Sequence, residues 1–215
     1  MAGLLEKDLR LLLSRKQSIV MFLLLAVVLG FTQAGTFILG YLPFLGVILT
    51  ISTISYDEVD NGYTFLMTLP IDRKTYVKEK FLFCISGAVS SWILAVVLYF
   101  LSGSLHGDKL VMINEIPMVL TFLAIVILLM AIMIPFQIKF GAEKSRIVML
   151  IIFGIITVVS FVFVKIIGQE TMNEIIEKME HINETYIMMC GIFLVLLSTV
   201  VSYMISCKVM ENKEL

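Results

Sequence analysis

A run of 39 residues without a single charged side chain, from Ser18 to Tyr56, most constrains how this chain can fold. As one helix it would be about 58 Å long, at roughly 1.5 Å per residue. The hydrocarbon core of a bilayer is about 30 Å thick and needs roughly 20 apolar residues per helix. The run therefore predicts two membrane spans, residues 18–32 and 36–56, joined by a tight outer turn.

The rest of the chain repeats this apolar pattern. Of its 215 residues, 60% are hydrophobic and 15% are charged, whereas about 25% of a soluble domain is charged. We therefore predict an all-α polytopic membrane protein, in which residues 1–215 form one transmembrane domain with six transmembrane helices. The four further spans are residues 81–101, 116–138, 147–164 and 186–207.

The distribution of Lys and Arg predicts the orientation. Thirteen of the 16 basic residues fall in the termini and alternate loops, and three, Lys109, Lys165 and Lys178, fall on the opposite side. Cytoplasmic loops carry the excess of basic residues, so both termini are expected in the cytoplasm. Residues 3–15 are expected to form a helix in the membrane interface, because their leucines share one face. A merely solvated N-terminus is the alternative. The net charge of −1 does not point to nucleic acid.

Residues 57–76 form the longest polar interruption that also carries several basic residues. Tyr63, Leu66 and Met67 fall near one face of a short helix, with acidic residues at its start, where they favour the helix dipole. Leu69-Pro70 is expected to end it, and Asp72 to cap a second helix. Such a short helix between two spans fits a groove on a soluble partner. A loop lying on the lipid headgroups is the alternative.

Residues 168–184 show a second amphipathic pattern, on the predicted outer side. Apolar residues recur there at helical spacing among glutamates, which predicts a short surface helix. It would gate an exit or receive a cationic substrate, or it would simply cap the bundle. The candidate exit residues are Glu170, Met172, Glu174, Ile176 and Glu177.

The chemistry of known catalytic motifs is absent from the sequence. There is no HExxH, no P-loop and no paired cysteine ligand set; Cys84, Cys190 and Cys207 are isolated. The middles of the spans carry essentially no ionisable residue, whereas ion-coupled carriers usually need one. We therefore expect no metal site and no cofactor in this chain, and energy supplied by another chain.

Two polar segments carry a family resemblance. Asp57-Glu58, Asn61-Gly62-Tyr63 and the run from Leu69 to Val77 resemble the first cytoplasmic loop of small bacterial ABC-2 type permeases. The segment from Ile134 to Arg146, with its Lys139-Phe140-Gly141, is similar to the loop between spans four and five in that group. Within it, the chain most resembles membrane subunits of exporters for amphipathic peptides such as phenol-soluble modulins.

The resemblance implies an assembly. A permease subunit of this family pairs with a second such subunit, as a homodimer or a heterodimer, and binds separate ATPase subunits that hold ATP-Mg. The helix from Asp57 to Met67 would be the coupling helix in a groove of the ATPase. The implied ATPase interface is Asp57, Glu58, Asn61, Gly62, Tyr63, Leu66, Met67, Leu69, Pro70, Arg73, Lys139, Glu143, Lys144 and Arg146.

These observations predict the permease subunit of an ATP-driven exporter in the bacterial cell membrane, moving amphipathic or hydrophobic substrates such as peptides. The chain itself would not be an enzyme. The alternative is a non-transporting immunity or sensor protein that binds a toxic peptide and needs no ATPase. An intramembrane enzyme is disfavoured, because the catalytic groups are missing.

Overall fold

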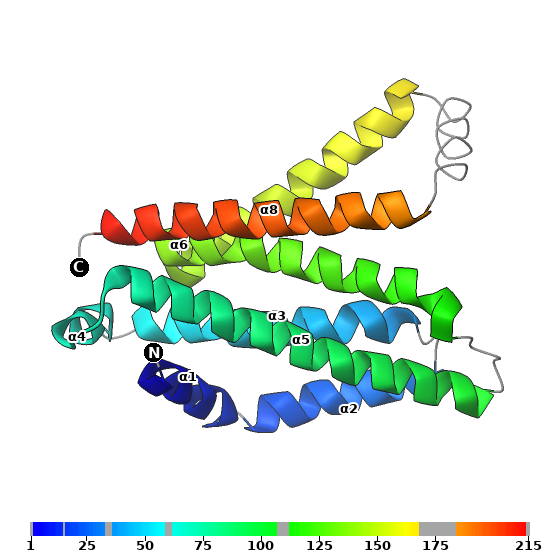
Figure 1. The fold of residues 1–215 in the computed structure, drawn as a ribbon, viewed down its shortest axis with the longest axis horizontal. Helices are drawn as coiled ribbons and strands as arrows, with labels where there is room; N and C mark the ends of the chain where they lie inside the picture. Colours follow the sequence, from blue (N-terminus) through cyan, green and yellow to red (C-terminus); the bar gives the residue numbers. More distant parts are fainter. Residues whose placement is uncertain are drawn as a thin grey trace.

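The computed structural model describes residues 2–14, 16–32, 36–58, 62–106, 112–167 and 184–213. All regular elements in these ranges are α-helices (Figure 1), so the all-α prediction is confirmed. They are α1 (Ala2–Ser14), α2 (Lys16–Thr32), α3 (Thr36–Glu58), α4 (Gly62–Thr68), α5 (Arg73–His106), α6 (Met112–Ile167) and α8 (Glu184–Glu211).

Helix α3 lies at the centre of the bundle and packs against α1, α2, α4, α5 and α6. Helix α8 packs against α6 and α5 on one side. Half of the residues in the apolar part of α3 are buried, against 11% for α8. The outward side of α8 is therefore an apolar surface suited to lipid. The short helix α4 and both chain termini gather at one end of the molecule (Figure 1).

Four helical segments are long and apolar enough to cross a membrane: Thr36–Glu58, Arg73–Ser104, Glu115–Gly141 and Met188–Glu211. Helices α1 and α2 would make a fifth if the pair forms one broken span, since Gly3–Ser14 and Ile19–Val28 meet at a bend of 65°. The protein is therefore multi-pass. Six spans, and the cytoplasmic location of the termini, stay predictions.

Each predicted span overlaps an observed helix, but the helices continue beyond the predicted ends. Residues 116–138 and 147–164 both fall within α6. The expected short loop at 139–146 is instead helical on both sides of one residue, Gly141, with φ 74° and ψ −178°. Beyond it, α6 diverges from the other helices (Figure 1). The predicted outer helix 168–184 lies outside the described residues, apart from Glu184.

Glycines let α3 and α5 approach closely. A Cβ atom on Gly46 would lie 2.6 Å from the Cβ of Ser91, and one on Gly87 would lie 2.3 Å from the Cγ2 of Thr50. Small residues at such positions are typical of helix pairs that pack through their backbones in membranes. The Thr50 hydroxyl donates to the carbonyls of Gly46 and Val47, at 3.0 Å each. Thr50 is therefore held by its own helix and has little freedom to move aside.

Replacing Gly87 by alanine tests this close approach. We expect Gly87→Ala to lower the free energy of unfolding by about 1–3 kcal/mol, because the new methyl group meets Thr50 and overpacked cores lose stability in this range. The measurement is thermal unfolding of the purified protein in detergent. Gly154→Ala is the matched control, since no heavy atom lies within 4 Å of its added Cβ, and a change within about 0.5 kcal/mol is expected. Equal melting temperatures for the two variants would contradict the close approach.

Candidate functional site

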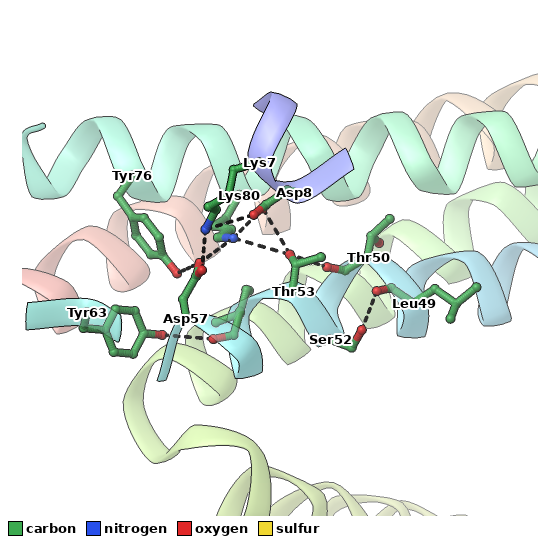
Figure 2. A network of polar contacts seen from close by, with 11 residues as sticks. Lys7, Asp8, Leu49, Thr50, Ser52, Thr53, Asp57, Tyr63, Tyr76 and Lys80 are labelled. Atoms are coloured by element: carbon green, nitrogen blue, oxygen red, sulfur yellow. Dashed lines mark hydrogen bonds and ion pairs between the residues drawn. The ribbon is translucent and has the colours of Figure 1, made fainter. Parts of the chain in front are cut away.

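Four charged side chains meet inside the bundle near α4 and form what we term the charge cluster: Lys7 and Asp8 of α1, Asp57 of α3 and Lys80 of α5 (Figure 2). Lys80 forms ion pairs with Asp8 and, at 2.7 Å, with Asp57. Lys7 forms ion pairs with Asp57 and, at 3.0 Å, with Asp8. Each carboxylate thus contacts both lysines, and the cluster joins three helices.

Hydroxyl groups complete the charge cluster. Tyr76 donates a hydrogen bond of 2.9 Å to the Asp57 carboxylate, and Thr53 donates one of 3.1 Å to the Asp8 carboxylate. The Lys80 ammonium donates to the Thr53 hydroxyl at 3.4 Å. These bonds satisfy groups that would be costly to bury alone.

The carboxyl groups in and beside the charge cluster are buried, so they need the positive charges of the lysines. The side chains of Asp8 and Lys80 are fully buried, and Asp57 is 5% exposed. Glu79 is also fully buried, and neither of its carboxylate oxygens has a hydrogen-bond partner among the described residues. Two lysines therefore stand against three buried carboxyl groups in this region.

Helix α4 is anchored to the charge cluster by aromatic contacts. The rings of Tyr63 and Tyr76 meet edge to face at 5.8 Å between centroids, and the Tyr63 hydroxyl donates to the carbonyl of Ile54 at 3.5 Å. Burial raises the pKa of the Tyr63 phenol above its usual value, and the nearby charges of Asp57 and Glu58 add to the shift. Tyr63 therefore stays a neutral hydrogen-bond donor.

The first residue of α4 must lack a side chain. A Cβ atom on Gly62 would lie 2.6 Å from the carbonyl oxygen of Asp57. The turn out of α4 is closed by the Leu69 and Ile71 amides, which donate to the carbonyls of Leu66 and Leu69. Helix α5 then begins at Arg73, with the Asp72 carbonyl accepting from the Tyr76 amide at 3.1 Å.

A single helix from Asp57 to Met67 was expected, but the observed helix begins later. Asp57 and Glu58 end α3, and α4 begins at Gly62. The physical reason is the charge cluster, which holds Asp57 inside the bundle as part of α3. Asn61 lies outside the described residues.

The face of α4 also differs from the expectation. Tyr63 and Leu66 share one face, as expected, but this face points inward: they are 5% and 7% exposed. The outward apolar side chains of this segment are Phe65, which is 68% exposed, Leu69, which is 41% exposed, and Pro70. Met67 is half-buried against the core. The inward face is favoured because the aromatic rings of α4 and α5 pack there.

The segment from Ile134 to Arg146, the second one that carries the family resemblance, lies against Glu58 at the end of α3. A Cβ atom on Gly141 would lie 2.2 Å from a carboxylate oxygen of Glu58. Ser145 donates to the side-chain oxygen of Gln137 at 2.5 Å, and the Gln137 amide donates to Ser55 of α3. The kink of α6 is thereby tied to the end of α3. Lys139 and Lys144 are exposed, while nothing is described of the side chains of Glu143 and Arg146.

The end of α8 closes the same region. Arg73 donates to the carbonyls of Met210, Glu211 and Lys213, at 3.0, 2.6 and 3.2 Å, which satisfies free carbonyl groups at the helix end. Lys213 lies 4.2 Å from the centroid of the Tyr63 ring and donates to the Ile138 carbonyl at 2.9 Å. Burial lowers the pKa of its ammonium, against the opposing charge of Glu58.

Several of these residues were not predicted from the sequence. Asp8 and Lys80 pair across 72 positions, and a single sequence gives no signal for such a pairing. One local signal exists: Asp8 shares a helical stripe with Leu4 and Leu12, and a carboxylate on an apolar stripe indicates a buried partner. The outer residues Glu170, Met172, Glu174, Ile176 and Glu177 lie outside the described residues.

The apolar helices and the bundle define a multi-pass membrane protein. Residues 3–211 match the family model described as ABC-2 family transporter protein. The chain belongs to this family, and it is accordingly a membrane permease component of an ABC transporter that works with an ATPase subunit. No match was found among the curated proteins or among the solved structures.

Removing Lys80 tests the charge cluster. We expect Lys80→Met to lower the free energy of unfolding by about 3–5 kcal/mol, because breaking a buried ion pair leaves uncompensated charge. The measurement is thermal or denaturant unfolding in detergent. Lys78→Met removes an exposed lysine from the same helix and should change stability by no more than about 0.5 kcal/mol.

A double variant tests whether Asp8 and Lys80 interact directly. Asp8→Asn in the Lys80→Met background should recover part of the loss, since residues in one network are not additive. Simple addition of the two single losses would contradict the pairing of Asp8 with Lys80.

Proposed function

We propose that this chain is the permease subunit of an ATP-driven exporter in the bacterial plasma membrane. It pairs with a second permease subunit and moves amphipathic or hydrophobic substrates, such as peptides. A separate ATPase subunit binds ATP-Mg and hydrolyses it, so this chain carries no cofactor and is not an enzyme. The observation that supports the proposal most directly is α4, which is anchored on one face and exposes apolar side chains on the other.

The exposed side of α4 is suited to docking. Phe65 and Leu69 are exposed, and α4 lies at one end of the bundle (Figure 1). No lipid chain is expected to cover them if this end lies in the cytoplasm. Large exposed apolar groups at such a place are typical of protein contact sites, and short helices commonly fit into grooves of a partner. We infer that the coupling contact is made by Phe65, Leu69 and Pro70, while Tyr63 and Leu66 hold the helix in place.

A continuous set of contacts leads from α4 into the bundle. The Tyr63 ring packs on Tyr76, Tyr76 bonds to Asp57, and the charge cluster then reaches α1, α3 and α5. A displacement of α4 by the ATPase would therefore move three further helices together. Coupling between distant sites travels through such contiguous networks.

An apolar cavity in the bundle supports the proposal that the substrates are amphipathic or hydrophobic. It has a volume of about 260 Å³ and lies between α1, α2, α3 and α5, where Leu12, Phe22, Leu49 and Leu94 contribute to its lining. Such a cavity accommodates a hydrophobic side chain or a short acyl segment. The lining is mostly apolar and includes the hydroxyl groups of Thr50, Ser90 and Ser91.

Changing the exposed side of α4 tests the proposal. The Phe65→Ser/Leu69→Ser double variant should lose its stoichiometric ATPase subunit on purification from native membranes in mild detergent, because the apolar contact is removed. Its melting temperature should stay close to that of the unaltered protein, since both side chains are exposed. The measurement is mass-spectrometric identification of co-purifying chains, with ATP hydrolysis by the purified complex.

Leu9→Ser/Leu13→Ser is the matched control. It removes two half-exposed leucines from α1 and should keep the ATPase. Retention of the ATPase by the α4 variant would contradict the docking assignment. Purification of the unaltered chain without any ATPase would instead favour the immunity or sensor function.

A further inference from the structure

An open pocket of about 410 Å³ lies between α6 and the end of α8, and its lining includes no residue of the charge cluster. Its lining is basic and apolar at once: Lys139, Lys208, Lys213 and Asn212 stand beside Ile205 and Val209. None of these described lining residues is acidic. Three ammonium groups around one opening attract a single anionic group.

Two acidic side chains lie close to the pocket. Glu211 forms an ion pair with Lys74 at 3.2 Å, outside the pocket lining. Glu58 forms an ion pair with Lys213 of the lining itself, at 3.9 Å, and so offsets the charge of that lysine. Lys139 and Lys208 form no ion pair with any described side chain; the Lys139 ammonium lies 5.0 Å from the centroid of the Phe140 ring. Their charges are therefore available to a ligand.

The third lysine forms a fixed wall of the pocket. Lys213 bonds to the Ile138 carbonyl and lies over the Tyr63 ring. Because the fold already holds the Lys213 side chain in place, ligand binding would cost less side-chain conformational entropy. The occupant would also lie beside Lys213, which links the end of α8 to Tyr63 of α4.

The surface beside the pocket is apolar along α8. Val201, Met204 and Ile205 are 45%, 66% and 49% exposed and lead along the helix to Lys208. Lys side chains at the end of a membrane span place their charge at the headgroup level. The combination suits a ligand with an anionic head and an apolar tail, rather than a free anion.

We propose that this pocket binds the phosphate headgroup of an anionic phospholipid, with the acyl chains lying along the exposed side of α8. Basic pockets between membrane helices bind anionic headgroups in this way. The lipid would brace the end of α8 against the kink of α6. The proposal does not depend on the identity of the exported substrate or on ATPase docking.

The test compares three probes on the purified full-length protein in detergent. They are dioctanoyl phosphatidylglycerol, dioctanoyl phosphatidylcholine and inorganic phosphate, and binding is measured by native mass spectrometry and by titrated thermal shift. Phosphatidylglycerol should bind most tightly, because it alone combines a net negative head with acyl chains. The Lys139→Gln/Lys208→Gln variant should weaken its binding about 30-fold, or roughly fivefold for each lysine.

Two control variants separate the pocket from general charge effects. Lys16→Gln/Lys78→Gln removes two exposed lysines that do not line the pocket and should keep the affinity. Lys139→Arg/Lys208→Arg keeps both charges and should also keep it. Unchanged binding in the glutamine variant of the pocket, or equal losses in both glutamine variants, would overturn the proposal. Phosphate binding as tight as that of phosphatidylglycerol would show a free-anion site and overturn the lipid assignment.

Discussion

The ion pairs of Lys80 with Asp8 and Asp57 are the interaction on which the arrangement of helices at this end depends. Burying an ion costs several kcal/mol, and the attraction between partners repays it only when further hydrogen bonds complete the geometry. Here Thr53 and Tyr76 provide those bonds. Apolar side chains would hold α1, α3 and α5 together in many registers, whereas two lysines and two carboxylates fit together in few. The charge cluster thereby fixes how α1 lies against the bundle.

The charge cluster can form because the backbones of α3 and α5 approach each other closely. Gly46 and Gly87 bring α3 and α5 together along their length, so Asp57 near the end of one helix meets Tyr76 and Lys80 near the start of the other. Gly62 and Gly141 serve the same end of the molecule, because side chains there would meet the Asp57 carbonyl and the Glu58 carboxylate. Gly141 also has a positive φ, which side chains of L-residues disfavour. Each glycine thus permits a contact in which a charged or polar group takes part.

The sequence predicted where the helices lie along the chain better than it predicted the contacts between them. Uncharged apolar runs indicated the helices, and Leu69-Pro70 indicated where α4 ends, because these signals are local. Helical spacing also placed Tyr63 and Leu66 on one face, but spacing does not say whether a face points inward or outward. The structure buries them and exposes Phe65 instead. The pairing of Asp8 with Lys80 and the contact of Glu58 with Gly141 join distant segments, and only tertiary packing determines them.

The central claim is that α4 and α1 move as one body through the charge cluster. A spin-label distance between Glu6→Cys on α1 and Thr68→Cys on α4 tests it directly, with Cys190 and Cys207 replaced by serine and the protein assembled with its ATPase. Glu6 and Thr68 are both exposed and accept a label. The account predicts the same distance distribution in the nucleotide-free and ATP-bound states, while labels at Thr68 of two paired permease subunits change their separation. A shift of the distance between Glu6 and Thr68 on ATP binding would contradict it.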